Sequence, residues 1–188
     1  MPSRRLRSAR IGGTRWSAFL FVACLWATTA TAQSRSGPGA ALPPEASAVL
    51  DRFAGTWDVT LTVRRPKNLV VTYAQTGAWV LNHRYLRGES DVRPDGSQEL
   101  SMFTYDPQSR TYPLWIFYSS GFVAYLQRGE WSESSRTMDW KSAAADPNQF
   151  ATRCTFENAT TLRCSTQVKD GKGGVAIDQE SVALRRRQ

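Results

Sequence analysis

Two side chains of opposite charge are the first candidates for chemistry in this 188-residue chain. Arg87 and Glu89 are two residues apart in a segment of alternating pattern, so in a strand they share one face with Tyr85. If that face lines an interior, the pair could bind a polar group of a ligand, or Glu89 could act as an acid or base with a raised pKa. If the face meets solvent, Leu86 and Val92 point inward instead. The alternation of apolar residues leaves both orientations open.

Aromatic residues are the second candidates, because the chain contains 7 Trp, 6 Tyr and 8 Phe. Such side chains can line a pocket for an apolar molecule, and they can equally fill a packed core. Phe117 and Trp140 are expected to belong to the same aromatic interior as several of the candidates. The candidate ligand-binding residues are Trp57, Trp79, Tyr85, Arg87, Glu89, Tyr105, Trp115 and Tyr125.

Other kinds of chemistry have little support in the sequence. His83 is the only histidine, and only two cysteines follow residue 32, so we expect no zinc or iron–sulfur site. No G-x-S-x-G pattern supplies a nucleophilic serine. The glycine-rich run at 171–174 lacks the spacing of a phosphate-binding loop. We therefore expect neither a metal nor a cofactor, and the sequence assigns no catalytic residue.

Short strands must position these side chains. From Gly55 onward, apolar and polar residues alternate in runs that are separated by turn sequences such as Pro94-Asp95-Gly96. This pattern predicts an all-β fold, an antiparallel up-and-down β-barrel of about ten strands. Barrel closure removes unpaired strand edges, and about ten strands leave either a cavity or a core filled by side chains.

A short helix is expected before the first strand. Pro43-Pro44-Glu45 suits a helix start, because proline is tolerated in the first turn and glutamate favours the positive end of the helix dipole. Gly55 is expected to end it. The helix should cover one end of the barrel with a single apolar stripe, formed by Ala46, Val49, Leu50 and Phe53.

The two cysteines of the later chain are expected to form a disulfide. Turn-forming residues at 157–160 lie midway between Cys154 and Cys164. A hairpin centred on Ala159 places the two cysteines directly opposite each other, within reach of a bond. Closing so short a loop should stabilise the fold by about 2–3 kcal/mol.

A signal for export is expected at residues 1–32. Five arginines precede the apolar segment Trp16–Ala27, which is too short to span a bilayer, and Ala30-Thr31-Ala32 suits cleavage after Ala32. We therefore expect a secreted or periplasmic protein with no stable membrane insertion after cleavage. Ser3-Arg4-Arg5 begins like a twin-arginine signal, but the residues that follow match it imperfectly, so general secretion is favoured over twin-arginine export and over lipidation at Cys24.

The charge of the chain lies largely in that leader. The whole chain has a net charge of +8, but without the leader it has 19 basic and 16 acidic residues and a net charge of +3. We therefore expect no nucleic-acid partner. After the leader we expect a flexible linker at 33–42, a barrel at 43–185 and a basic tail at 186–188. The terminal arginines, Arg185–Arg187, should form a frayed, solvated end.

Several motifs together resemble a known family. Gly55-Thr56-Trp57 after a short helix resembles the opening of calycins, the group of lipocalins and fatty-acid-binding proteins. The runs 81–89, 103–107 and 112–119 add an apolar-aromatic strand, a Tyr-Asp turn and a strand centred on Trp115. Over residues 50–184 the chain resembles the DUF1579 family, although Thr104 replaces a common glycine and Tyr118-Ser119 a common Asp-Ser pair. The resemblance implies a calycin-like barrel and no known activity.

Three functional hypotheses follow from these observations. The first is an exported calycin-like barrel that binds a small, largely apolar molecule. The second is an enzyme on the same barrel, an isomerase or hydrolase that uses Glu89 with Arg87 or a tyrosine. The third is a structural or interaction protein whose barrel is filled by its own side chains.

Overall fold

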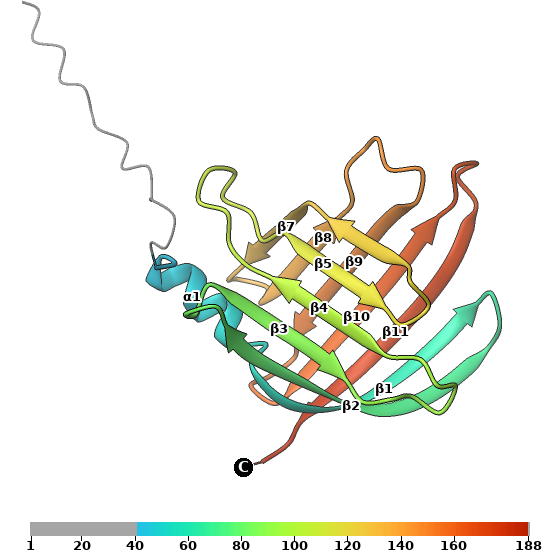
Figure 1. Ribbon diagram of the computed structural model, residues 1–188, viewed down its shortest axis with the longest axis horizontal. Coiled ribbons are helices and arrows are strands. Elements are labelled where there is room, and N and C mark those ends of the chain that lie inside the picture. The colour runs from blue at the N-terminus through green and yellow to red at the C-terminus, as the bar shows by residue number, and fades with distance from the viewer. Residues whose placement is uncertain (1–40, 188) are drawn as a thin grey trace, which may run out of the picture. The chain divides into compact units, whose positions relative to one another are not determined.

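The computed structural model describes residues 41–187, which form one helix and eleven strands (Figure 1). This confirms the expected all-β barrel with a short helix before the first strand. In chain order the elements are α1 (Pro44–Asp51), β1 (Gly55–Arg65), β2 (Leu69–Val80), β3 (Tyr85–Ser90), β4 (Glu99–Phe103), β5 (Leu114–Tyr118), β6 (Val123–Leu126), β7 (Arg128–Ser132), β8 (Thr137–Lys141), β9 (Gln149–Phe156), β10 (Thr161–Lys169) and β11 (Val175–Arg185).

All eleven strands belong to one antiparallel sheet in the order β6-β5-β4-β3-β2-β1-β11-β10-β9-β8-β7. The two edge strands of this sheet, β6 and β7, are consecutive in the chain and are separated only by Gln127. This continuous segment of the chain pairs first with β5, through β6, and then with β8, through β7. We call the place where these two edge strands meet the seam. Beside this seam, the backbone N–H of Tyr112 donates to the carbonyl of Gly129 at 2.8 Å. The sheet thus curls into a nearly closed barrel.

Helix α1 packs its apolar stripe onto the end of the barrel where β1 begins. Ala46, Val49 and Leu50 are buried in the common core. Phe53 follows the helix, and its ring packs edge-on against three aromatic rings of the barrel, with centroids 4.9–5.7 Å apart. Such contacts bury a large apolar area, so this end is closed by packing. Those three rings belong to Phe103, Trp140 and Phe156.

Two arginines at the end of β11 and directly after it bind the segment that joins α1 to β1 and the start of β1. The guanidinium of Arg185 donates to the carbonyl of Ala54 at 2.6 Å and to that of Arg52 at 2.5 Å, and it lies 4.2 Å from the ring centroid of Trp57. Arg186 next to it forms an ion pair with Asp58. The expectation of a frayed, solvated end is therefore wrong for Arg185, which two carbonyls and an aromatic ring hold, whereas Arg186 is exposed and forms its ion pair in solvent.

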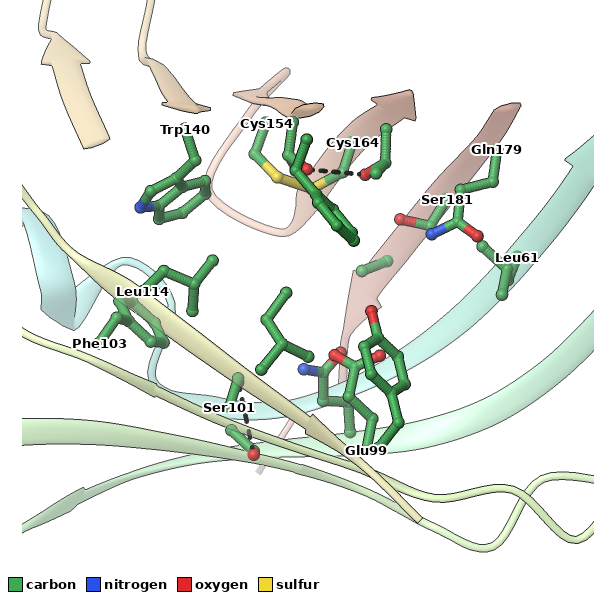
Figure 2. A pocket seen from close by; sticks show the side chains of 18 of the residues that line it. Leu61, Glu99, Ser101, Phe103, Leu114, Trp140, Cys154, Cys164, Gln179 and Ser181 are labelled. Carbon is green, nitrogen blue, oxygen red and sulfur yellow. Dashed lines mark hydrogen bonds between the residues drawn. A yellow bond between two sulfur atoms is a disulfide. The ribbon is translucent and has the colours of Figure 1, made fainter. Parts of the chain in front are cut away.

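The disulfide between Cys154 and Cys164 is present, as expected. The two residues are direct partners across β9 and β10, with their Cα atoms 4.0 Å apart. The hairpin register predicted from the turn sequence is therefore confirmed. Both cysteines face the interior of the barrel, where they contribute to the lining of the cavity (Figure 2).

The expected signal peptide and most of the expected linker, residues 1–40, lie outside the described residues. Leu42, at the end of the expected linker, is already buried in the core with α1. Within residues 41–187, no helix is long and apolar enough to cross a membrane.

Candidate functional site

The inner face of the sheet encloses a cavity of about 480 Å³. Strands from most of the barrel contribute to its wall, and α1 lies beyond one end of it (Figure 2). We call the opposite end the distal end; it is formed by the loops at 66–68, 91–98, 119–122, 142–148 and 170–174, between consecutive strands. Toward α1 the lining is apolar, and toward the distal end polar and charged side chains join further apolar ones, which are Phe122, Phe150, Val168 and Ile177.

The half of the cavity near α1 is apolar. Trp57, Phe103 and Trp140 are buried there, together with Leu114 and Leu162. The indole N–H of Trp140 donates to the carbonyl of Tyr112 at 2.8 Å, so its one polar atom is satisfied within the wall. A ligand in this half of the cavity would therefore contact aromatic and aliphatic side chains.

The middle of the cavity carries uncharged polar side chains. The hydroxyl groups of Thr152 and Thr166 are hydrogen-bonded to each other at 3.0 Å across β9 and β10. Gln75, Gln179 and Ser181 line the same cavity from β2 and β11. Among the described residues, none makes a side-chain hydrogen bond to these three, so their polar atoms are available to a ligand or to water.

An ion pair lies at the distal end of the cavity. Arg93 donates to the Oε2 atom of Glu99 at 2.9 Å, and the two side chains are only 9% and 21% exposed. The guanidinium carbon of Arg93 lies 4.3 Å from the ring centroid of Tyr73. Tyr118 is the partner of Glu99 across β4 and β5. We call these four side chains, Tyr73, Arg93, Glu99 and Tyr118, the distal cluster.

Local structure holds this cluster in place. The backbone N–H of Arg93 donates to the carbonyl of Ser97 and its carbonyl accepts from Gly96, which closes a tight turn. Gly96 has a φ of 79°, which glycine adopts without steric cost. On the other side, the backbone N–H of Glu99 donates to the buried hydroxyl of Ser90 at 2.9 Å. The turn thus directs the Arg93 side chain into the barrel beside the first residue of β4.

Burial also fixes the protonation of the two phenols in the cluster. Burial raises the pKa of Tyr73, and the negative charge of Glu99 raises it further. The pKa of Tyr118 is raised for the same two reasons. Both phenols therefore keep their proton far above neutral pH and can donate as well as accept a hydrogen bond.

The family pattern described as "Protein of unknown function (DUF1579)" matches residues 43–175. This chain belongs to the DUF1579 family. The resemblance inferred from the sequence motifs is thereby confirmed, and the structure has the antiparallel barrel that the resemblance implied. No curated protein matches the chain.

Several solved structures are similar to this chain at low identity and with TM-scores below 0.5. An S-type phycobiliprotein lyase, CPES from Guillardia theta, is 11% identical over 75% of this chain and 92% of that chain, with a TM-score of 0.48. A DUF3598 protein of unknown function from Nostoc punctiforme is 9% identical over 73% and 49%, with a TM-score of 0.46. EF1p2_mFAP2b bound to DFHBI is 15% identical over 76% and 99%, with a TM-score of 0.40.

The DUF1579 barrel places Arg87 and Glu89 on its outer surface. Their side chains are 46% and 47% exposed and pair with each other at 3.3 Å. The residues that alternate with them along β3, which are Leu86, Gly88 and Ser90, are buried. The expectation that this charged face could line the interior is therefore corrected, because the opposite face of β3 points inward.

Of the aromatic candidates, Trp57 alone lines the cavity. Trp115 stacks on Tyr125 at 4.9 Å and lies near Tyr85 at 6.5 Å, in the same row of side chains as the exposed Arg87, so these three belong to the outer face. The expectation that they line the interior is corrected by the strand register. Phe117 is exposed on the same face and is corrected with them.

The two remaining candidates lie close to the barrel core but outside the cavity. The indole N–H of Trp79 donates to Asp51 of α1 at 2.7 Å, and the ring stacks on His83. Tyr105 packs against Tyr112, with ring centroids 5.0 Å apart. Both therefore contribute to the end of the barrel that carries α1, and neither contacts the space that a ligand would occupy.

The distal cluster was not found from the sequence. Arg93 directly precedes Pro94, in a segment that reads as an exposed turn. Glu99, however, lies two and four residues before Ser101 and Phe103, which both face inward. Once that alternation is known, it places a carboxylate inside the barrel, and such a carboxylate needs a partner.

A second hollow, of about 900 Å³, lies beside the outer face of β8, β9 and β10. Its charged lining residues include Arg128, Lys141 and Lys169, all exposed. Within the described part of the chain, no group of three or more His, Cys, Asp or Glu side chains is arranged to hold a metal ion.

Proposed function

We propose that this DUF1579 barrel binds a small, largely apolar molecule in its interior. The observation that carries the proposal is the cavity of about 480 Å³, with an aromatic half near α1 and hydrogen-bonding groups beyond it. Pockets for small molecules are typically apolar with a few placed polar groups. The apolar part of the ligand would lie against Trp57, Phe103 and Trp140, and its polar end would point to the distal cluster.

The polar lining supports a ligand role over a purely structural one. Protein cores are close-packed, and buried polar groups in them are normally hydrogen-bonded. Gln75, Gln179 and Ser181 face the cavity without a side-chain hydrogen bond to another described residue. A barrel filled solid by its own side chains would leave neither this volume nor these free amides. The enzyme hypothesis based on Glu89 and Arg87 inside the barrel is not retained, because both lie outside.

Binding can be tested with retinol, a neutral molecule with a long apolar body that absorbs where tryptophan emits. Trp57 and Trp140 line the cavity, so retinol inside it should quench their fluorescence saturably, with one molecule bound per chain. The variant Ser181→Trp would fill the cavity from β11. It should abolish quenching of this kind.

A matched control lies on the same strand. Leu184 is 53% exposed on β11, so Leu184→Trp adds the same ring outside the barrel and should leave retinol binding intact. Quenching that persists equally in both variants, or that never saturates, would contradict binding in the interior. Circular dichroism of both variants confirms that each is folded.

Export is a separate part of the proposal. We propose that the chain is secreted or delivered to the periplasm after cleavage behind Ala32. The basic, apolar and small-residue segments of residues 1–32 support this, and a disulfide is typical of an oxidising compartment. The intact mass of the exported protein should correspond to a chain that begins at Gln33. A chain that begins at a lipid-modified Cys24 would contradict it.

A further inference from the structure

We propose that the distal cluster selects a ligand whose polar end is uncharged, of the hydroxyl or amide class, over a carboxylate or an ammonium group. The proposal rests on the proposed function, since it assumes that the cavity holds a ligand. It specifies which chemical class that ligand belongs to.

The first argument is the charge of the cavity wall. Among the described residues that line the cavity, Arg93 is the one cation and Glu99 the one anion. They pair with each other at 2.9 Å, so their formal charges cancel within a single hydrogen bond. A ligand carboxylate near Arg93 would also lie near Glu99 and be repelled, and an ammonium near Glu99 would be repelled by Arg93.

The second argument is burial. The two side chains are 9% and 21% exposed, so water and salt screen their interactions with a nearby charge only weakly. A charged ligand group would lose its hydration on entering this site and find no uncompensated opposite charge there. A neutral polar group loses much less on leaving water.

The third argument is the supply of hydrogen bonds. Tyr73 and Tyr118 line the same part of the cavity, and burial keeps both phenols protonated. A phenol that can both donate and accept matches a hydroxyl or amide, which needs both. One N–H of the Arg93 guanidinium donates to Glu99, and the guanidinium packs on the face of Tyr73, while its buried Nε–H has no partner among the described residues. Arg93 therefore keeps donor capacity for the oxygen of a hydroxyl or amide, and the charge of Glu99 beside it disfavours a carboxylate in the same place.

The test uses three probes with one chain length: decanol, decanoate and decylammonium, each measured by displacement of retinol at neutral pH. The full mature protein should bind decanol more tightly than either charged probe. The variant Glu99→Gln leaves Arg93 as the sole charge, so it should shift the ratio of decanoate to decanol affinity toward decanoate by about tenfold or more. Arg93→Gln should shift the preference toward decylammonium in the same way.

The control variant is Glu89→Gln, which neutralises a carboxylate outside the barrel and should leave all three affinities unchanged. If Arg93→Gln does not fold because it leaves a buried carboxylate unpaired, Glu99→Gln still carries the test. Decanoate as the best probe for the unaltered protein, or an unchanged ratio in Glu99→Gln, would overturn the inference while retinol binding upheld the proposed function. Failure of retinol itself to bind would overturn the proposed function instead.

Discussion

Replacement of Arg185 by methionine should destabilise the barrel far more than replacement of its neighbour Arg186. Arg185 donates two hydrogen bonds to the backbone carbonyls of Arg52 and Ala54, and it stacks on Trp57. These contacts tie the last strand to the segment that joins α1 to β1. Arg186 pairs with Asp58 in solvent, where both side chains are about half exposed.

The magnitude follows from these contacts. A hydrogen bond from a charged donor contributes about 1.5–3 kcal/mol net, and a cation–π contact about 0.5–2 kcal/mol. Because contacts of one side chain are not additive and Arg185 is partly exposed, we expect Arg185→Met to lower the free energy of unfolding by about 3–4 kcal/mol. An exposed ion pair contributes about 1 kcal/mol at most, which sets the limit for Arg186→Met.

Urea denaturation followed by circular dichroism measures both variants, with equal m-values as the sign that the same surface unfolds. Arg185→Lys should lie between the unaltered protein and Arg185→Met, because an ammonium keeps the charge but cannot reproduce the planar fork of donors. If Arg185→Met lowered the free energy of unfolding no more than Arg186→Met does, the reasoning would be refuted. The two hydrogen bonds to backbone carbonyls would then contribute nothing to stability.

Three further predictions concern stability. Reduction of the disulfide between Cys154 and Cys164 should lower the free energy of unfolding by about 2–3 kcal/mol, and a thiol count on the unreduced, denatured protein should find no thiol in the chain after residue 32. Leu81 is exposed and has a φ of 52°, a left-handed backbone conformation that costs a leucine about 1 kcal/mol. Leu81→Gly removes this backbone strain and should raise the melting temperature by a few degrees; a lower melting temperature would contradict this. A hydrogen bond from Ser109 lowers the pKa of Asp106 below its usual 3.8. The ionised carboxylate of Asp106 therefore stabilises the folded protein fully above that pH, and this stabilisation is lost as the pH falls through the lowered pKa. Asp106→Asn should therefore lose less stability than the unaltered protein as the pH falls below about 4, and identical pH profiles would contradict this cause.

Much of the fold could be predicted from local pattern. The alternation from Gly55 and the turn sequences predict antiparallel strands, and the Cys154–Cys164 hairpin register follows from its turn. The division between β6 and β7 could not be predicted, because residues 121–131 have the pattern of one continuous strand. Its division at Gln127 arises from pairing with two different neighbours, β5 and β8, which no local pattern reports.

The candidate site was predicted less well, because strand orientation decides it. In β3 both faces carry an apolar residue, and a one-residue change of orientation exchanges Arg87 and Glu89 for Gly88 and Ser90. Arg93 could not be placed in the cavity from the sequence, because its direction depends on how the turn at 93–97 folds over β4. Trp57 was placed correctly, since it lies on a strand whose alternation is unambiguous.

A crystal structure with a decanol that carries bromine at the end opposite its hydroxyl tests the central claim most directly. Bromine scatters X-rays anomalously, so its position can be located without ambiguity. If the barrel binds a ligand as proposed, the bromine should lie inside the cavity near Phe103 and Trp140, and the hydroxyl should lie beside Arg93 and Glu99. Bromine on the outer surface, or at the distal cluster with the hydroxyl near α1, would contradict the account.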